Sequence, residues 1–179
     1  MSDSVAVWLV CAVLLFWAVG AYKRLLRLRA QAIAAFAPLE AQFAHYAALV
    51  HNSFAAIHHD DGPAARAGLV GAALQLESSM KVARARPLDV LVMRALETAH
   101  EALCASWARV RNEPPDLAGG PLPQALQLQW EHIALNAGQA RAEFNQHVQV
   151  YNAAVRQFPA ALLARLFGFR PAHMISDRA

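Results

Sequence analysis

The sequence predicts an all-α protein in which an N-terminal transmembrane helix continues into an antiparallel up-and-down four-helix bundle. Two observations carry this prediction: an uncharged apolar segment near the N-terminus, and four stretches of apolar residues at helical spacing after it. Ala, Leu, Val, Gln, Glu and Arg dominate the composition, which favours helices over strands. We expect an N-terminal segment with its anchor over residues 1–22 and one helical bundle with a short tail over residues 23–179.

The apolar segment runs from residue 5 to residue 22 without a charged side chain. As a helix, its eighteen residues span about 27 Å, close to the thickness of a bilayer's hydrocarbon core. Trp8 lies near one end and Trp17 and Tyr22 near the other, where aromatic rings favour the membrane interface. We interpret this segment as a retained membrane span.

Two cleaved segments are the alternatives to a retained span. A secretory signal peptide carries Lys or Arg before its apolar stretch, whereas only Asp3 precedes this one. A lipoprotein signal has a small residue before its cysteine, whereas the bulky Val10 precedes Cys11. Both patterns therefore fit less well than a single-pass anchor.

Positive charge is concentrated directly after the apolar segment, at Lys23, Arg24, Arg27 and Arg29. From residue 30 onward, twelve Lys and Arg balance twelve Asp and Glu, so the rest of the chain is neutral. The positive-inside rule then predicts that the N-terminus lies outside and the bundle in the cytoplasm. We expect the chain in the inner (plasma) membrane. Basicity confined to a membrane junction also argues against nucleic-acid binding.

Four helical stretches follow from apolar residues that recur every three or four positions. They extend from Leu25 to Ile57, from Leu69 to Ala83, from Leu88 to Val110 and from Leu126 to Phe158. Pro38 interrupts the first stretch and is expected to kink it. Short connections, including a turn at residues 58–63 and a Pro-rich loop at 112–121, imply antiparallel neighbours. Heptad-like spacing of this kind also resembles coiled-coil packing.

Four antiparallel helices bring the chain back to the membrane side of the bundle, so the tail over residues 159–171 is expected near the bilayer. One interpretation is an interfacial foot, with Phe167 and Phe169 among headgroups and Arg165 and Arg170 facing anionic lipid. The other, which we favour on sequence grounds, is that Leu162, Leu166 and Phe169 cap the open end of the bundle.

The C-terminal third contains the motif Tyr151-Asn152-Ala153-Ala154-Val155-Arg156-Gln157-Phe158-Pro159, followed by Leu166-Phe167-Gly168-Phe169. This motif resembles the LemA family. The first soluble helix departs from the family, because Ala47-Ala48-Leu49-Val50-His51-Asn52 lacks the usual Ile-Pro-Asn-Leu-Val stretch. The resemblance implies a divergent bacterial member with a membrane-tethered helical bundle, and it implies no particular activity.

The motif residues are expected to have structural roles. Tyr151 and Phe158 should pack inward, and Asn152 should hydrogen-bond a neighbouring helix. Pro159 should end the last helix, and Gly168 should allow a sharp turn between two phenylalanines.

Catalytic and metal-binding patterns are weak in this sequence. Glu97-x-x-His100 has the spacing found in helical di-iron proteins, but the second copy that such sites require is absent. The cluster His58-His59-Asp60-Asp61 is more typical of a solvated turn than of a metal site. Cys11 and Cys104 lie too far apart in the expected architecture to form a disulfide. We expect no catalytic residues, no metal and no cofactor.

Three functions remain open from the sequence. The leading hypothesis is a membrane-tethered scaffold or adaptor that binds the lipid bilayer and an unidentified protein partner. The second is a lipid-interacting or membrane-shaping protein that uses its amphipathic C-terminal tail. The third, an enzyme, would require a metal or substrate site that the sequence does not indicate.

Overall fold

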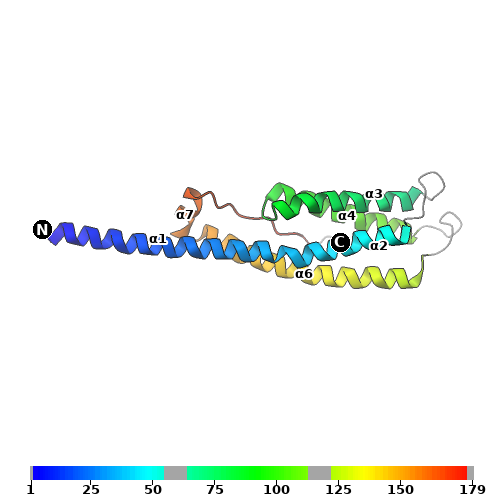
Figure 1. Cartoon of the computed structure of the whole chain (residues 1–179), viewed down its shortest axis with the longest axis horizontal. Coiled ribbons are helices and arrows are strands. Elements are labelled where there is room, and N and C mark those ends of the chain that lie inside the picture. Colours follow the sequence, from blue (N-terminus) through cyan, green and yellow to red (C-terminus); the bar gives the residue numbers. More distant parts are fainter. Residues whose placement is uncertain (1, 55–63, 113–121, 177–179) are drawn as a thin grey trace.

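A computed structural model of the chain describes residues 2–54, 64–112 and 122–176 and contains only helices, turns and irregular segments over those ranges (Figure 1). The expected all-α fold is therefore confirmed. The described helices are α1 (Ser2–Ala34), α2 (Phe36–Phe54), α3 (Ala64–Ala85), α4 (Val90–Asn112), α6 (Gln124–Arg156) and α7 (Ala160–Leu166).

The first two helices form one long rod with a single interruption at Ala35. The Ala35 N–H still donates to the carbonyl of Gln31 at 2.9 Å, so the helical ladder is intact up to this residue. Pro38 has no N–H to donate to the carbonyl of Ala34, and its ring clashes with that carbonyl in a regular helix. The predicted Pro38 kink is therefore found as a break three residues before the proline.

The α1–α2 rod, α3, α4 and α6 run in alternating directions and pack side by side, as an up-and-down bundle requires (Figure 1). α3 packs against both α2 and α4, and α6 packs against α1 and α2. α4 and α6 are joined by the stacked rings of Trp107 and Trp130, whose centroids lie 4.2 Å apart. The core follows the predicted stripes, and its largest fully buried side chains include Leu25, Leu39, Phe43, Tyr46, Leu69, Leu76, Leu96, Leu103, Phe144 and Tyr151.

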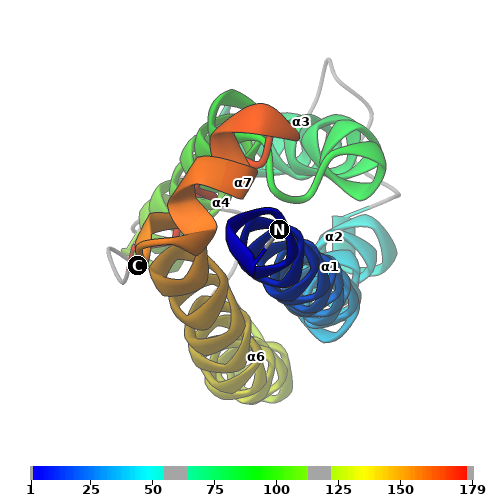
Figure 2. The ribbon, with the colours of Figure 1, turned by 90° about the vertical axis from the view of Figure 1, so that its left-hand side faces the viewer.

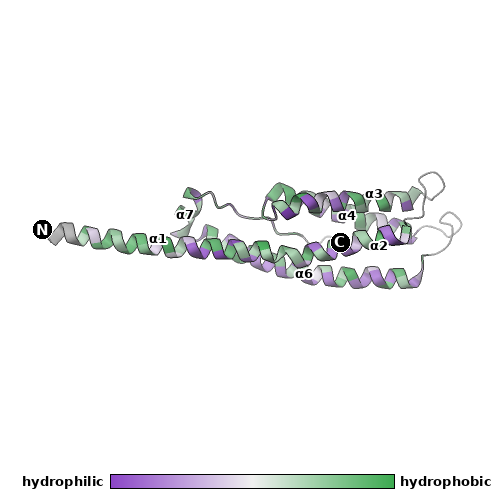
Figure 3. Ribbon diagram, viewed as in Figure 1, coloured by the Kyte–Doolittle hydropathy of each residue, from purple (hydrophilic) through white to green (hydrophobic). Residues whose placement is uncertain are grey.

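The apolar first half of α1 projects beyond the rest of the bundle (Figure 3). Its large side chains are exposed, with Trp8 at 77% and Phe16 at 84% of their accessible surface. In the described part of the chain, the rod that contains this segment is the one helix long and apolar enough to cross a membrane. Large apolar side chains exposed to this extent along one helix fit a membrane anchor.

The helices of the bundle differ in length, so they do not all reach the same end. The 33 residues of α6 span about 50 Å, whereas the 22 residues of α3 span about 33 Å. α1 and α6 therefore continue past the α3–α4 turn, and α7 folds against both of them (Figure 2). The following residues, 169–176, run back along the bundle, and we call them the C-terminal segment (Figure 1).

Candidate functional site at the base of the bundle

The base of the bundle is the end formed by α7, the last turns of α6 and the part of α1 around Tyr22. There the Tyr22 ring lies 4.8 Å from the ring of Phe167 and 6.0 Å from the ring of Phe169, measured between centroids. Aromatic pairs at such distances contribute about 0.5–1.5 kcal/mol beyond the area they bury. This cluster joins the anchor helix to the C-terminal part of the chain.

Gly168 positions both phenylalanines by ending α7 sharply. Its φ of 72° lies in the left-handed region that favours glycine. The Phe169 N–H donates to the carbonyl of Ala164 at 2.8 Å, and the Gly168 N–H donates to that of Arg165 at 3.4 Å. This pair of bonds is a Schellman motif, and Ala164, whose carbonyl accepts the Phe169 N–H, is buried. The expected sharp turn at Gly168 is therefore present.

Two asparagines on α6 hold the backbone of the C-terminal segment. The Asn152 side-chain amide donates to the carbonyl of Ala172 at 2.9 Å and accepts the Ala172 N–H at 2.7 Å. Asn145 makes the same pair of bonds with Ile175, at 2.8 Å and 2.9 Å. Each asparagine thus satisfies both polar backbone groups of one residue, and the buried side chains of Ala172 and Ile175 join the core.

Glu97 on α4 holds the other side of the same segment. Its carboxylate is 2.9 Å from Nε2 of His173, and it accepts the Ser176 N–H at 2.7 Å as well as the Ser176 hydroxyl. Burial alone would raise the pKa of Glu97, but the hydrogen bonds from Ser176 and His173 outweigh it and lower that pKa below its ordinary value. The C-terminal segment therefore bridges α4 and α6.

The comparison with known families covers this same region. The sequence model of the LemA family matches residues 77–177, which is more than half of the chain. The chain belongs to the LemA family. Comparisons with curated proteins and with solved structures give no match. The residues that match the LemA family include Glu97, Asn145 and Asn152 and the whole C-terminal segment, so the family region contains the complete bridge between α4 and α6.

An apolar groove of about 770 Å³ lies between the projecting half of α1 and the end of α6. Phe16 and Trp17 line it from one side, and Phe158 and Pro159 line it from the other. Arg24 is the charged residue that borders it. In this LemA-family chain, the groove therefore begins on the apolar anchor and ends at the first positive charges after it.

The bundle interior contains titratable groups that packing keeps neutral. The His100 ring stacks on Phe43 with centroids 4.6 Å apart, and its Nε2 lies 3.6 Å from Sγ of Cys104. Burial, with a smaller effect from the positive charge of Arg141, lowers the pKa of His100 to about 4. Burial likewise raises the pKa of Cys104 to about 11. At neutral pH these are an uncharged imidazole and a thiol, which suits packing better than nucleophilic chemistry.

Glu97 and His100 do not share one site, although they lie three residues apart. Glu97 faces the C-terminal segment, whereas His100 faces the interior. Among the described residues, no three His, Cys, Asp or Glu lie close enough to hold a metal ion. The cluster at residues 58–61 lies outside the described residues. Cys11 and Cys104 are both free.

Some of the predicted site residues lie where the sequence predicts them, and others do not. The junction residues Lys23, Arg24, Arg27 and Arg29 are all exposed on α1. Tyr151 and Val155 are buried as expected.

Four expectations were wrong. Phe158 is 78% exposed, because α6 ends at Arg156 and the inward stripe does not continue past the helix. For the same reason Pro159 does not end α6, and it lies instead at the start of α7. Asn152 binds the C-terminal segment and not a neighbouring helix. Leu162 and Leu166 are 61% and 76% exposed, so they do not cap the core. The buried Ala164 and the partly buried Phe169 pack against it in their place.

The residues that hold the C-terminal segment in place were not identified from the sequence. These are Glu97, Asn145, His173 and Ser176. One signal was available, since Asn145 and Asn152 lie seven residues apart and therefore on one face of α6. The segment that they bind has no periodic pattern, so their target could not be identified from the sequence.

Proposed function

We propose that this chain is a non-catalytic, single-pass scaffold or adaptor at the bacterial inner membrane, with its N-terminus outside and its bundle in the cytoplasm. The contrast between the two halves of the rod carries the proposal. Residues 7–16 expose large apolar side chains, whereas the second half of α1 and α2 are packed into the core. The positive charges from Lys23 to Arg29 lie where the exposed apolar segment gives way to the packed part of the rod, and the positive-inside rule places the cytoplasmic surface at such charges.

The interior supports a structural role for the bundle. His100 packs on Phe43 inside the bundle, and Glu97 on its side attaches the C-terminal segment. A rigid bundle held at a membrane presents outer faces to other proteins, and we propose that one of these faces recruits a partner.

Proximity labelling from the full-length protein in its native membrane tests this proposal. Leu128 on α6 and Leu74 on α3 are exposed to a similar extent, 57% and 53%, but lie on different helices. We expect one of the two substitutions, Leu128→Glu or Leu74→Glu, to abolish labelling of a partner that the wild type enriches, and the other to leave that labelling intact. Neither should change the helical content. Failure of the wild-type protein to enrich any reproducible partner would contradict a scaffold function.

A second candidate function is lipid contact through the base, and one observation favours it. Leu162, Leu166, Phe158 and Phe167 are all more than half exposed beside the anchor helix. Exposed apolar side chains next to a membrane span are typical of an interfacial surface.

A matched pair of labelled variants tests lipid contact. Leu166→Cys and Leu135→Cys replace leucines that are 76% and 70% exposed, the first at the base and the second in the middle of α6. In a Cys11→Ala background the remaining Cys104 reacts slowly, because burial raises its pKa to about 11. After reconstitution into vesicles, a polarity-sensitive dye at 166 should shift to the blue and be quenched by lipid-borne quenchers. Equal emission at both positions would contradict lipid contact.

A further inference from the structure

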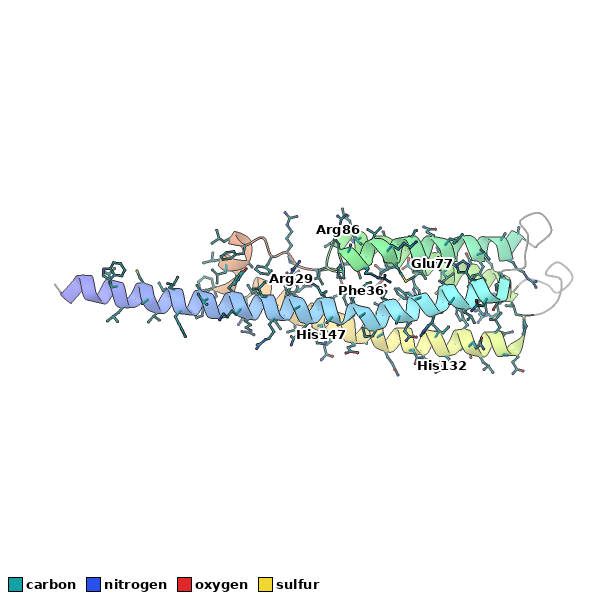
Figure 4. The ribbon with its side chains drawn as sticks, in the orientation of Figure 1. Arg29, Phe36, Glu77, Arg86, His132 and His147 are labelled. Carbon is teal, nitrogen blue, oxygen red and sulfur yellow. The ribbon has the colours of Figure 1, made fainter. Side chains whose placement is uncertain are left out.

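A second hollow, of about 630 Å³, lies between α1, the α3–α4 turn and the C-terminal segment. Four arginines from different parts of the chain line it: Arg29, Arg84, Arg86 and Arg170. Figure 4 labels Arg29 on α1 and Arg86 in the turn that follows α3, and both residues line the hollow. Asp89 is the one acidic residue in the lining.

Two of these five charges already have partners. Arg84 forms an ion pair with Glu40, to which its Nε also donates at 2.6 Å. The Asp89 carboxylate accepts the N–H groups of Leu91 and Val92 at 2.9 Å and 3.2 Å, so it caps the N-terminus of α4.

The other three charges lack an acidic partner. Arg29, Arg86 and Arg170 form no ion pair with any described residue. Three positively charged side chains line one hollow, and each of them would attract an anion bound there. The hollow therefore has a positive charge that the described residues do not neutralise.

The shape and number of these donors favour a phosphoryl group over a carboxylate. A guanidinium donates two parallel hydrogen bonds to a pair of oxygen atoms, and a phosphate offers three or more oxygens with up to two negative charges. A single carboxylate has two oxygens and one charge, which matches fewer than three arginines. We propose that the pocket formed by Arg29, Arg86 and Arg170 binds a phosphoryl group. This proposal does not depend on the scaffold role.

The position of the pocket leaves two sources for that group. Arg29 lies seven residues after Tyr22, hence about 10 Å beyond the end of the apolar segment along the helix. This depth lies a few ångströms outside the headgroup layer, since headgroups add about 5–8 Å on each side of the hydrocarbon core. A lipid phosphomonoester and a free phosphate in the cytoplasm can both reach it.

The test uses full-length protein in nanodiscs of neutral phosphatidylcholine, titrated with inorganic phosphate, and the same protein in nanodiscs that also contain phosphatidic acid. Binding is followed by calorimetry for phosphate and by the shift in unfolding temperature for both probes. We expect saturable binding or stabilisation by at least one of them. Phosphate alone would identify the free anion as ligand, and phosphatidic acid alone would identify the lipid headgroup.

Arg29→Gln and Arg27→Gln form the matched pair of variants. Both arginines are exposed on α1, two residues apart and at nearly the same depth, but Arg27 does not line the hollow. Arg29→Gln should weaken binding about tenfold, as expected for losing hydrogen bonds to a charged group. Arg29→Gln with Arg86→Gln should abolish saturation, whereas Arg27→Gln should leave affinity nearly unchanged. Equal losses in Arg27→Gln and Arg29→Gln, or no saturable effect of either probe on the wild type, would overturn the proposal.

Discussion

Asn145 and Asn152 lie seven residues apart on α6, and each holds both backbone polar groups of one residue in the C-terminal segment. Seven residues of helix span about 10.5 Å. The two residues they hold, Ala172 and Ile175, are three apart, which corresponds to about 9–10 Å of extended or polyproline-like chain. The asparagine spacing therefore matches the rise of the segment.

Removing these amides should release the C-terminal segment while the helices remain folded. Each asparagine contributes two hydrogen bonds, worth about 0.5–1.5 kcal/mol apiece, so Asn152→Ala should cost about 1–3 kcal/mol. Asn145→Ala with Asn152→Ala should also remove the hydrogen-exchange protection of the Ala172 and Ile175 amides. Both effects are measurable by denaturant unfolding and exchange mass spectrometry.

Gln149→Ala is the control for the asparagine variants. Gln149 lies between the two asparagines on α6, is exposed, and its side chain makes no hydrogen bond to the described residues. Its removal should change stability by less than about 0.5 kcal/mol. Undiminished protection of residues 172–176 in the double asparagine variant would contradict the role of the two amides.

The helices were predictable because burial repeats along them. Residues such as Leu69, Leu76 and Leu103 were placed correctly, since a periodic apolar stripe needs no knowledge of its neighbours. The same reasoning failed at Phe158, where the stripe was extended beyond the end of its helix.

The C-terminal segment was not predictable for a different physical reason. Its backbone is held by side chains distant in sequence, and Glu97 contacts residues 76 and 79 positions away. Such contacts leave no local pattern in the segment itself. The arginine pocket was missed on the same grounds, because Arg29, Arg86 and Arg170 come from three parts of the chain.

Glu97 should make the attachment of the segment depend on pH. Its pKa is lower in the folded protein than its ordinary value of 4.5, so the folded state favours the carboxylate. Its contribution is therefore fully present above pH 4.5 and is lost as the pH falls through the folded pKa. We expect Glu97→Gln to lower the unfolding temperature at neutral pH, with a gap to the wild type that shrinks in acid. A gap that stays constant down to acidic pH would show that the charge is unimportant.

His100 should destabilise the protein in mild acid. Burial lowers its pKa from 6.5 to about 4, so protons bind the unfolded chain first as the pH drops. The contribution of His100 to the free energy of unfolding should be constant above pH 6.5. Between pH 6.5 and pH 4 it should lower that free energy by roughly 3 kcal/mol at most. His100→Phe, which can keep the stack on Phe43, should remove this part of the pH dependence in urea titrations followed by tryptophan fluorescence. An unchanged pH profile in the variant would assign the acid sensitivity to other groups.

Gly168 and Gly138 provide a comparison in which only the backbone conformation differs. A Cβ at either position meets no atom within 4 Å, so neither alanine would clash. Gly168 has a φ of 72°, where alanine is strained, whereas Gly138 lies inside α6, where alanine is favoured.

Gly168→Ala should therefore cost about 1 kcal/mol, and Gly138→Ala should stabilise the protein by about 0.5–1 kcal/mol. Because Gly168 also directs Phe167 and Phe169 toward Tyr22, its variant should loosen α7 from α1. Crosslinking between cysteines placed at Gln157 and Ala21, which both line the apolar groove, should become slower in Gly168→Ala and remain unchanged in Gly138→Ala. Equal crosslinking in both variants would mean that the turn at Gly168 does not fix the position of the base against the anchor.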